Sequence, residues 1–257
     1  MSRGKIIALC LVSFLIAFAQ SSPAVDVLEE TIEQKYPVDP DATLSISNTD
    51  GSIRIYAAAT SEISIQAIKK AYTAERLKGI VVDVKATGNS VTINTIFPPR
   101  KNTLSDRSGT VDYILIVPQT VRITQLDLVN GEALVEGLRG GSAIAHLTNG
   151  WMGGHDCFGD LDLTLENGRL DVAYDWWENR KFSVKASSPR GNLRAILPSD
   201  SSVILNATTV EGRVANGLDP RKTSGVIHSL NTVIGADAET VIELKAERGN
   251  IRIEKSY

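Results

Sequence analysis

The sequence predicts an all-β fold, and three observations support this prediction. The 257 residues are 42% apolar and 22% charged, which is typical of a globular chain. Short segments in which apolar and polar residues alternate recur along the chain. Turns that end in glycine precede many of these segments at similar intervals. We therefore expect a single domain of many short strands, arranged as a repeat.

The N-terminus has the features of an export signal. Arg3 and Lys5 precede a 14-residue apolar run at 6–19, whose last residues, Ala17-Phe18-Ala19, fit the small-x-small rule for cleavage. A second cleavage point follows Ala24. The run is shorter than the roughly 20 residues that span a bilayer, so we expect no transmembrane span after cleavage. The mature chain is predicted to reach the periplasm, the cell surface or the extracellular space.

The predicted cleavage site divides the chain. Residues 1–19 are the expected signal peptide, 20–39 an N-terminal lead-in or cap, and 40–257 the repetitive β domain. Cleavage removes Cys10 and leaves Cys157 as the only cysteine, so the mature chain has no internal disulfide. We expect Cys157 to be a small, buried apolar residue.

Charge and motifs exclude several classes of function. The chain has 27 basic and 30 acidic residues and no basic stripe, whereas nucleic-acid-binding proteins usually carry one. It has no Gly-x-Ser-x-Gly elbow and no phosphate-binding loop. We therefore expect no nucleic-acid partner, no cofactor and no catalytic residues.

The strands are predicted by strict period-two alternation, which places one face on the core and the other in water. This pattern occurs at 44–47, 63–67, 82–86, 91–93, 161–165, 182–186 and 251–254. The run 113–118 is apolar almost throughout, so we expect a strand covered on both faces that ends at Pro118. Only 69–79 has the composition of a short helix.

Glycine-ended turns give the repeat its period. They contain Gly131, Gly150, Gly168, Gly191, Gly212 and Gly249, separated by 19, 18, 23, 21 and 37 residues. Gly51 precedes Gly131 by 80 residues, or about four periods. The spacing favours a β-solenoid of roughly 20-residue coils with glycine at the corners, about eleven coils in all, with 29–38 and 254–255 as caps. The alternative is an antiparallel β-sandwich in which Asn-Gly closes hairpins.

These segments resemble a known family. LSISNTDGSIRIYA at 44–57, VDYILIVPQ at 111–119, and the later NGEALVEGL, NGRLDV and RGNLRA segments are similar to the bacterial "putative adhesin" domain family. The resemblance covers the chain from about residue 40 to its end. It implies an exported, repetitive protein with a right-handed β-solenoid fold and no agreed catalytic residues.

Four aromatic residues are the candidate ligand-binding residues. The chain is poor in aromatics, yet Trp151, Tyr174, Trp176 and Trp177 include all three tryptophans. Trp151 and Trp176 are 25 residues apart, near one coil, so the four are expected to form one surface patch. Such a patch stacks on sugar rings or inserts into a partner. The competing interpretation is that they cover one flank of the core.

Two further groups of residues are weaker candidates. His155 and Cys157 would share one face of an extended strand, with Asp156 on the other, which leaves too few ligands for a structural zinc site. We therefore predict no metal. Asp160, Asp162 and Asp171 provide the paired acids that glycoside hydrolysis needs, but such acids more often lie on the wet face of a strand.

The sequence thus favours an exported, non-catalytic adhesin-like protein that presents its surface to a protein or polysaccharide at the cell envelope. Two alternatives stay open. One is a polysaccharide-active β-helix enzyme, and the other is a structural envelope module that contacts only its own copies.

Overall fold

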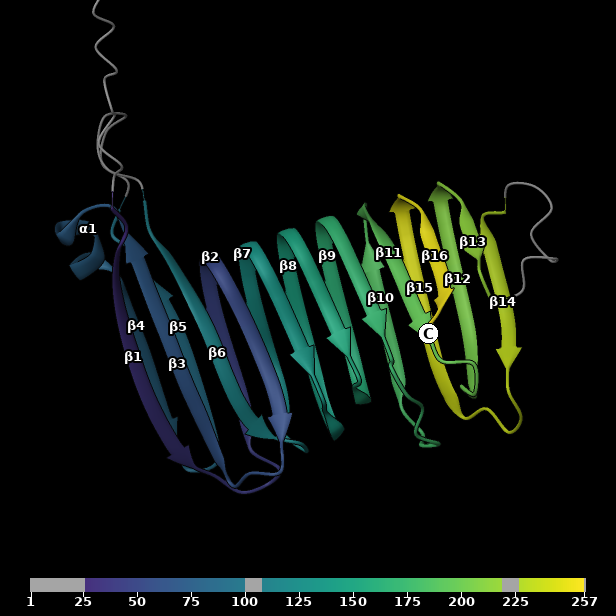
Figure 1. Ribbon diagram of the computed structural model, residues 1–257, viewed down its shortest axis with the longest axis horizontal. Helices are drawn as coiled ribbons and strands as arrows, with labels where there is room; N and C mark the ends of the chain where they lie inside the picture. Colours follow the sequence, from purple (N-terminus) through teal and green to yellow (C-terminus); the bar gives the residue numbers. More distant parts are fainter. Residues whose placement is uncertain (1–25, 100–107, 219–226, 257) are drawn as a thin grey trace, which may run out of the picture.

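The structure is a computed structural model that describes residues 26–99, 108–218 and 227–256. The protein is all-β, with a single short helix in these residues, and its strands form one mixed sheet that is not closed (Figure 1). The predicted signal peptide lies outside the described residues. No helix in the described part of the chain has the length and apolar character needed to cross a membrane.

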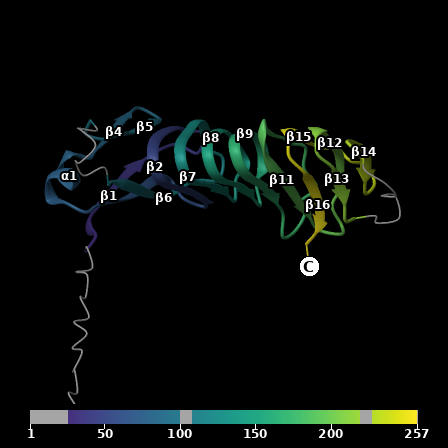
Figure 2. The ribbon, with the colours of Figure 1, turned by 90° about the horizontal axis from the view of Figure 1, so that it is seen from above.

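Four long strands form the centre of the sheet: β2 (Thr43–Ala58), β7 (Arg122–Glu136), β8 (Arg139–His155) and β9 (Phe158–Ala173). Each pairs in parallel with the next, although β8 begins three residues after β7 ends. Straight parallel strands need a crossover of about a dozen residues, so each long strand must itself turn back. Figure 2 shows these strands curving round the core. We call one curved strand, or two shorter strands on the same path, a rung.

A column of glycines marks the bend of each rung. Gly51, Gly131, Gly150 and Gly168 are successive partners in the parallel ladders. Their φ angles of 128°, 134°, 136° and 133° are unfavourable for residues with a Cβ. A Cβ on Gly150 would also lie 1.9 Å from the carbonyl oxygen of Gly131. These Asp-Gly and Asn-Gly steps therefore bend strands inside parallel ladders and do not close antiparallel hairpins.

Both halves of a rung contribute to one core. In β7, Leu126 and Leu128 precede the bend, Ala133 and Val135 follow it, and all four are buried. The same alternation places the intervening residues on the outside of the stack. Parallel, in-register pairing then aligns the outward side chains of successive rungs in rows.

The N-terminal end corrects our interpretation of the 80-residue interval, because Gly51 and Gly131 are direct partners with no rung between them. After β2 the chain leaves the stack and forms β3 (Glu62–Ala71), α1 (Ala74–Gly79), β4 (Val81–Thr87), β5 (Ser90–Ile96) and β6 (Thr110–Pro118). The strands β5 and β6 pair with the two halves of β2 and form the next rung outward. Antiparallel strands, including the edge strand β1 (Leu28–Pro37), complete this end.

The C-terminal rungs do not follow chain order. The first two rungs after β9 in the sequence are β10 (Ser183–Ser188) with β11 (Arg190–Leu197), and β12 (Val203–Glu211) with β13 (Val214–Asn216). The last rung of the chain, β15 (Thr240–Arg248) with β16 (Ile251–Lys255), pairs in parallel between them. The final edge is β14 (Ser229–Ile234), antiparallel to β12. Residues 254–255 were expected to be a cap, but they continue β16 and pair with the end of β11.

Two local predictions have mixed outcomes. The helix expected within 69–79 is present as α1, but β3 occupies the first residues of that range. The strand at 113–118 is not covered on both faces, because Ile116 is 44% exposed. Its pairing partners β2 and β3 lie on either side within the sheet, so its outer face meets solvent.

Candidate functional site

Three of the four predicted aromatic residues come together in one cluster. Tyr174, Trp176 and Trp177 follow the end of β9, and all three pack around Phe158, with ring centroids 5.4, 4.4 and 6.4 Å away. Tyr174 is fully buried, Trp177 packs against the core, and Trp176 is 39% exposed. The cluster therefore covers one flank of the core, and only Trp176 offers substantial surface to a ligand.

The fourth aromatic residue lies apart, so the four do not form the single patch we predicted. Trp151 follows the bend at Gly150 and pairs in register with Arg169, in the second half of its rung. Its indole Nε1 donates a hydrogen bond to Asp171 Oδ2 at 2.9 Å. The spacing of 25 residues was misleading because Trp151 stands within a strand, whereas Trp176 stands beyond the end of one.

The structure brings a different neighbour to His155 than the sequence pattern predicted. Asp156 has φ of 48° and turns out of the extended conformation, so its carboxylate joins His155 instead of facing away. His155, Asp156 and Asp175 place one ligand atom each within 4.8 Å of one another. Cys157 is fully buried, and burial raises the pKa of its thiol to about 12. Cys157 is therefore a core residue, as predicted, and not a partner of His155 in metal binding.

The three acids considered for hydrolysis do not share a site. Asp160 and Asp162 lie in β9 before its glycine bend, and Asp171 lies after it. Asp160 accepts hydrogen bonds from the backbone N–H and hydroxyl of Ser183, at 2.8 and 2.9 Å. Asp171 is bound to two arginines. A carboxylate engaged in this way is poorly suited to act as a general acid.

A groove that the sequence did not single out lies over the C-terminal rungs. Its volume is about 370 Å³, and four of its lining residues are arginines. The lining consists of Arg169, Asn192, Leu193, Arg194, Arg213, Ala215, Asn250, Ile251 and Arg252. These residues come from β9, β11, β13 and β16 and from the bends that precede β13 and β16. None of them is acidic.

Alternation within the strands places the arginines at the surface. Leu193 and Ile251 are partners in the parallel ladder, and both point into the core. The residues on either side of them in sequence therefore point outward, and Arg194 and Arg252 are partners in the same ladder. The glycine bends thus set which side chains reach this groove.

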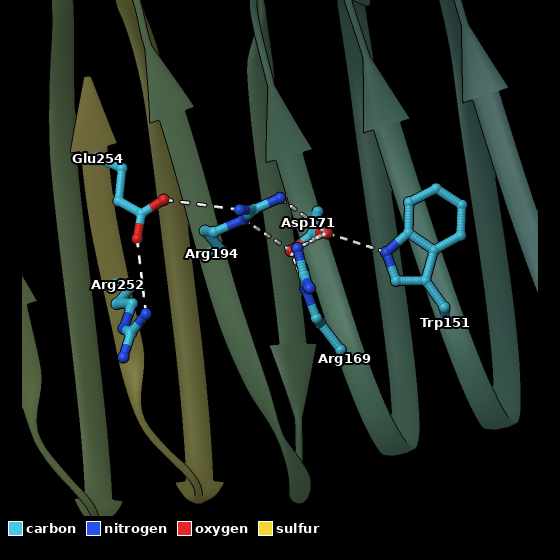
Figure 3. A network of polar contacts seen from close by, with 6 residues as sticks. All are labelled: Trp151, Arg169, Asp171, Arg194, Arg252 and Glu254. Atoms are coloured by element: carbon cyan, nitrogen blue, oxygen red, sulfur yellow. Dashed lines mark hydrogen bonds and ion pairs between the residues drawn. The ribbon is translucent and has the colours of Figure 1, made fainter. Parts of the chain in front are cut away.

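The carboxylate of Asp171 anchors one wall of the groove (Figure 3). It is 5% exposed and lies 2.8 Å from Arg169 Nη2 and 3.2 Å from Arg194 Nε. Hydrogen bonding to Asp171 raises the pKa of Arg169. Together with the indole of Trp151, these contacts satisfy the buried carboxylate and hold the two guanidinium groups in place.

The other wall is more open. Glu254 bridges Arg194 and Arg252 at the longer distances of 3.6 and 3.7 Å (Figure 3). The side chain of Arg252 is 65% exposed. Arg213 is exposed as well, and it forms no ion pair with any residue in the described part of the chain. The groove therefore keeps guanidinium groups that are available to an anionic ligand.

A signal for this groove was present in the sequence. The glycine-ended turns from Gly168 onward carry arginine one or three residues after the glycine. Both positions lie on the outward face of the following strand. The arginines nevertheless form no basic stripe in the sequence, because their proximity depends on the order in which the rungs stack.

No protein-family profile and no curated protein sequence matches this chain. A solved structure from Clostridium sporogenes, described as a putative cell adhesion protein, aligns with a TM-score of 0.53, 12% identity, and coverage of 88% of this chain and 100% of its own. A putative adhesin from Bacteroides fragilis aligns with a TM-score of 0.34, 12% identity, and coverage of 87% and 97%. The first alignment shows a shared fold, and the second is too loose to carry an argument. The resemblance predicted from the sequence is thus confirmed in the fold.

Proposed function

We propose that this protein is an exported, non-catalytic binding protein of the adhesin type, wound as a β-solenoid and presenting its outer surface to a protein or polysaccharide at the cell envelope. The fold shared with a structure described as a putative cell adhesion protein supports this proposal. The features of an export signal in residues 1–19 support the expected location.

The observation that carries the proposal is the arginine-lined groove. Four arginines from neighbouring strands and the bend before β13 line a depression of about 370 Å³ in which no lining residue is acidic. Such a surface recognises a ligand by hydrogen bonding and charge. Because in-register rungs align their outward side chains, a ligand with repeating groups meets repeating contacts along the stack.

The positions and contacts of the three aspartates disfavour a catalytic role. Inverting and retaining glycosidases both need two carboxyl groups that flank the bond to be broken. Here Asp171 is held by Arg169 and Arg194 on one half of the rung, whereas Asp160 and Asp162 precede the bend. We therefore propose a surface that binds without transforming its ligand.

Among the aromatic residues, we retain Trp176 as a candidate ligand contact. Its ring packs against Phe158 at an interplanar angle of 45°, and Arg139 lies 4.9 Å from its ring centroid. Tyr174 and Trp177 act instead by packing the core beneath it. Trp151 is linked to the groove through Asp171.

The experiment is a capture assay with the mature chain, residues 20–257. The protein is passed over immobilised neutral and acidic polysaccharides and over peptidoglycan, and the same mixtures are assayed for new reducing ends. We expect retention on at least one polymer without release of reducing ends. Release of reducing ends that Asp160→Asn abolishes would establish the enzyme alternative.

Solution scattering over a range of protein concentrations tests the remaining alternative. A binding protein is expected to keep the same scattering profile when it is diluted. Concentration-dependent assembly, together with no retention on any polymer, would instead identify a structural module that contacts its own copies.

A further inference from the structure

We infer that the arginine groove binds an acidic polysaccharide, whose carboxylate or sulfate groups contact guanidinium groups from neighbouring rungs. This inference rests on the proposed binding function and names the class of ligand. Its basis is the arrangement of the donors, the hydrogen bonds that orient them and the local balance of charge.

The arginines lie in two parallel rows across neighbouring strands. Arg194 and Arg252 are ladder partners in one row, and Arg169 pairs with Asn192 in the other. Arg213, which immediately precedes β13, continues the row of Arg169. The order of these strands is β9, β11, β16 and β13, because β11 pairs with β9 and with β16, and β16 pairs with β13. Adjacent strands are about 4.8 Å apart, so each row runs along the stack in steps of that size, and the two rows are offset by two residues along the strands. A ligand with one isolated anion would use one or two of these groups, whereas a chain of anions would use all of them.

Two asparagines add neutral donors to the row that contains Arg169 and Arg213. Asn192 Oδ1 accepts the backbone N–H of Asn250 at 2.9 Å, and Asn250 Oδ1 accepts the backbone N–H of Arg213 at 3.1 Å. These bonds fix which end of each amide faces the backbone. The Nδ2 groups of Asn192 and Asn250 make no hydrogen bond within the described residues, so they are available to hydroxyl or carboxylate oxygens of a ligand.

The charges leave an excess of positive charge in the groove. Asp171 is shared by Arg169 and Arg194, and Glu254 is shared by Arg194 and Arg252. Four guanidinium groups thus face two carboxylates. Bidentate hydrogen bonding by guanidinium is well matched to carboxylate and sulfate groups.

An acidic polysaccharide fits this charge density better than a nucleic acid does. Double-stranded DNA carries a negative charge about every 1.7 Å and requires an extended basic surface. The groove is small, its arginines are flanked by Asp171 and Glu254, and the whole chain has a net charge of −3. Widely spaced acidic groups, with hydroxyls between them, match a row in which two asparagines lie between Arg169 and Arg213.

The test uses the mature chain, residues 20–257, and defined polymers in isothermal titration calorimetry at low salt. The probes are polygalacturonate, its uncharged methyl ester, dextran sulfate, monomeric galacturonate and an oligo-dT single strand. We expect the acidic polysaccharides to bind at least about tenfold more tightly than the ester and the monomer, and binding to weaken as salt screens the charges.

Matched variants locate the binding site. The double variant Arg213→Ala with Arg252→Ala removes two exposed groups of the groove and spares the partners of Asp171. The control, Lys185→Ala with Lys245→Ala, removes the same charge from β10 and β15, before the glycine bends of neighbouring rungs. We expect the groove variant to lose at least about tenfold in affinity and the control to change less than about twofold.

Each other outcome overturns the inference. Equal binding of polygalacturonate and its ester would refute charge recognition, although the proposed binding function would stand. Tighter binding of oligo-dT would assign the groove to nucleic acid. Equal losses in the two double variants would place the site elsewhere. No binding of any acidic probe would refute the inference alone if the capture assay still finds a neutral ligand, and both proposals would fail if it finds none.

Discussion

Asn149 donates a hydrogen bond from its side-chain Nδ2 to Oδ1 of Asn130, 3.0 Å away on the preceding rung. The same contact continues on both sides, since Asn167 donates to Asn149 at 3.1 Å and Asn130 donates to Asp50 at 2.8 Å. These residues immediately precede the glycines of the bends. A ladder of side-chain amides therefore connects successive rungs beside the column of glycines.

Asn149→Ala should destabilise the fold by about 1 kcal/mol, because it removes one donated and one accepted bond at an exposed site where water replaces part of the loss. Chemical denaturation measures this change. The control is Asn179→Ala, which alters an exposed loop residue and should cost less than about 0.5 kcal/mol. Equal losses in the two variants would show that the ladder contributes no stability.

Gly150→Ala should prevent folding or cost about 3 kcal/mol or more, because both the backbone conformation and the approach to the Gly131 carbonyl exclude a Cβ. The matched control is Gly88→Ala, in the turn between β4 and β5. Gly88 has φ of 58° but open space around it, so only the conformational penalty of about 1–2 kcal/mol applies. Denaturation curves that give similar losses would contradict the close-packed column.

Trp177→Ala should cost about 3–5 kcal/mol, since the ring packs at 5.3 Å from Tyr174 and 5.8 Å from Phe182. Trp177→Phe should cost much less. It keeps an aromatic ring and removes a buried indole N–H that has no partner in the described part of the chain. Urea unfolding compares the two. A similar loss in both would mean that the indole itself, rather than ring packing, is required.

Cys157 should be unreactive in the folded protein. Its thiol is fully buried and lies 3.4 Å from the carbonyl oxygen of Val135. A thiol reagent at pH 8 should label the protein only in denaturant, with one equivalent for the mature chain. Rapid labelling without denaturant would show that β8 and β9 open at this position.

Burial of the same thiol predicts loss of stability at high pH. Its pKa is raised from 9.0 to about 12 in the folded protein, so the unfolded chain ionises first and stability falls as pH rises from about 9 to 12. Tyr113, with a pKa raised from 10.0 to about 12, acts in the same direction. Cys157→Ala should therefore reduce the slope of stability against pH without abolishing it, as measured by denaturation at several pH values.

Local patterns in the sequence predicted the strands and the bends. Alternation of apolar and polar residues identified the core positions of β2, β9 and β16, and the burial of Cys157 followed from its place in an exported chain. The glycines of the bends were identifiable because a residue with a Cβ is excluded there by conformation. Each of these features is decided by residues close together in the chain.

The candidate site could not be predicted from local patterns, because its residues are far apart in the sequence. Arg194 and Arg252 are 58 residues apart in sequence, yet they are ladder partners because the last rung of the chain inserts between two earlier ones. Asp156 joins His155 because of a single left-handed residue that the strand pattern did not indicate. Trp151 and Trp176 are separated because one lies in a strand and the other follows its end.

Residues that are near one another in the sequence set which segments form strands, where those strands bend and which faces they bury. The tertiary structure alone decided the order in which the rungs stack and thus which outward side chains become neighbours. The physical reason is that alternation and glycine conformation act within a few residues. The order of the rungs depends instead on backbone hydrogen bonds between parallel strands. Every rung offers equivalent backbone N–H and C=O groups at its edges, so local sequence does not select its neighbour.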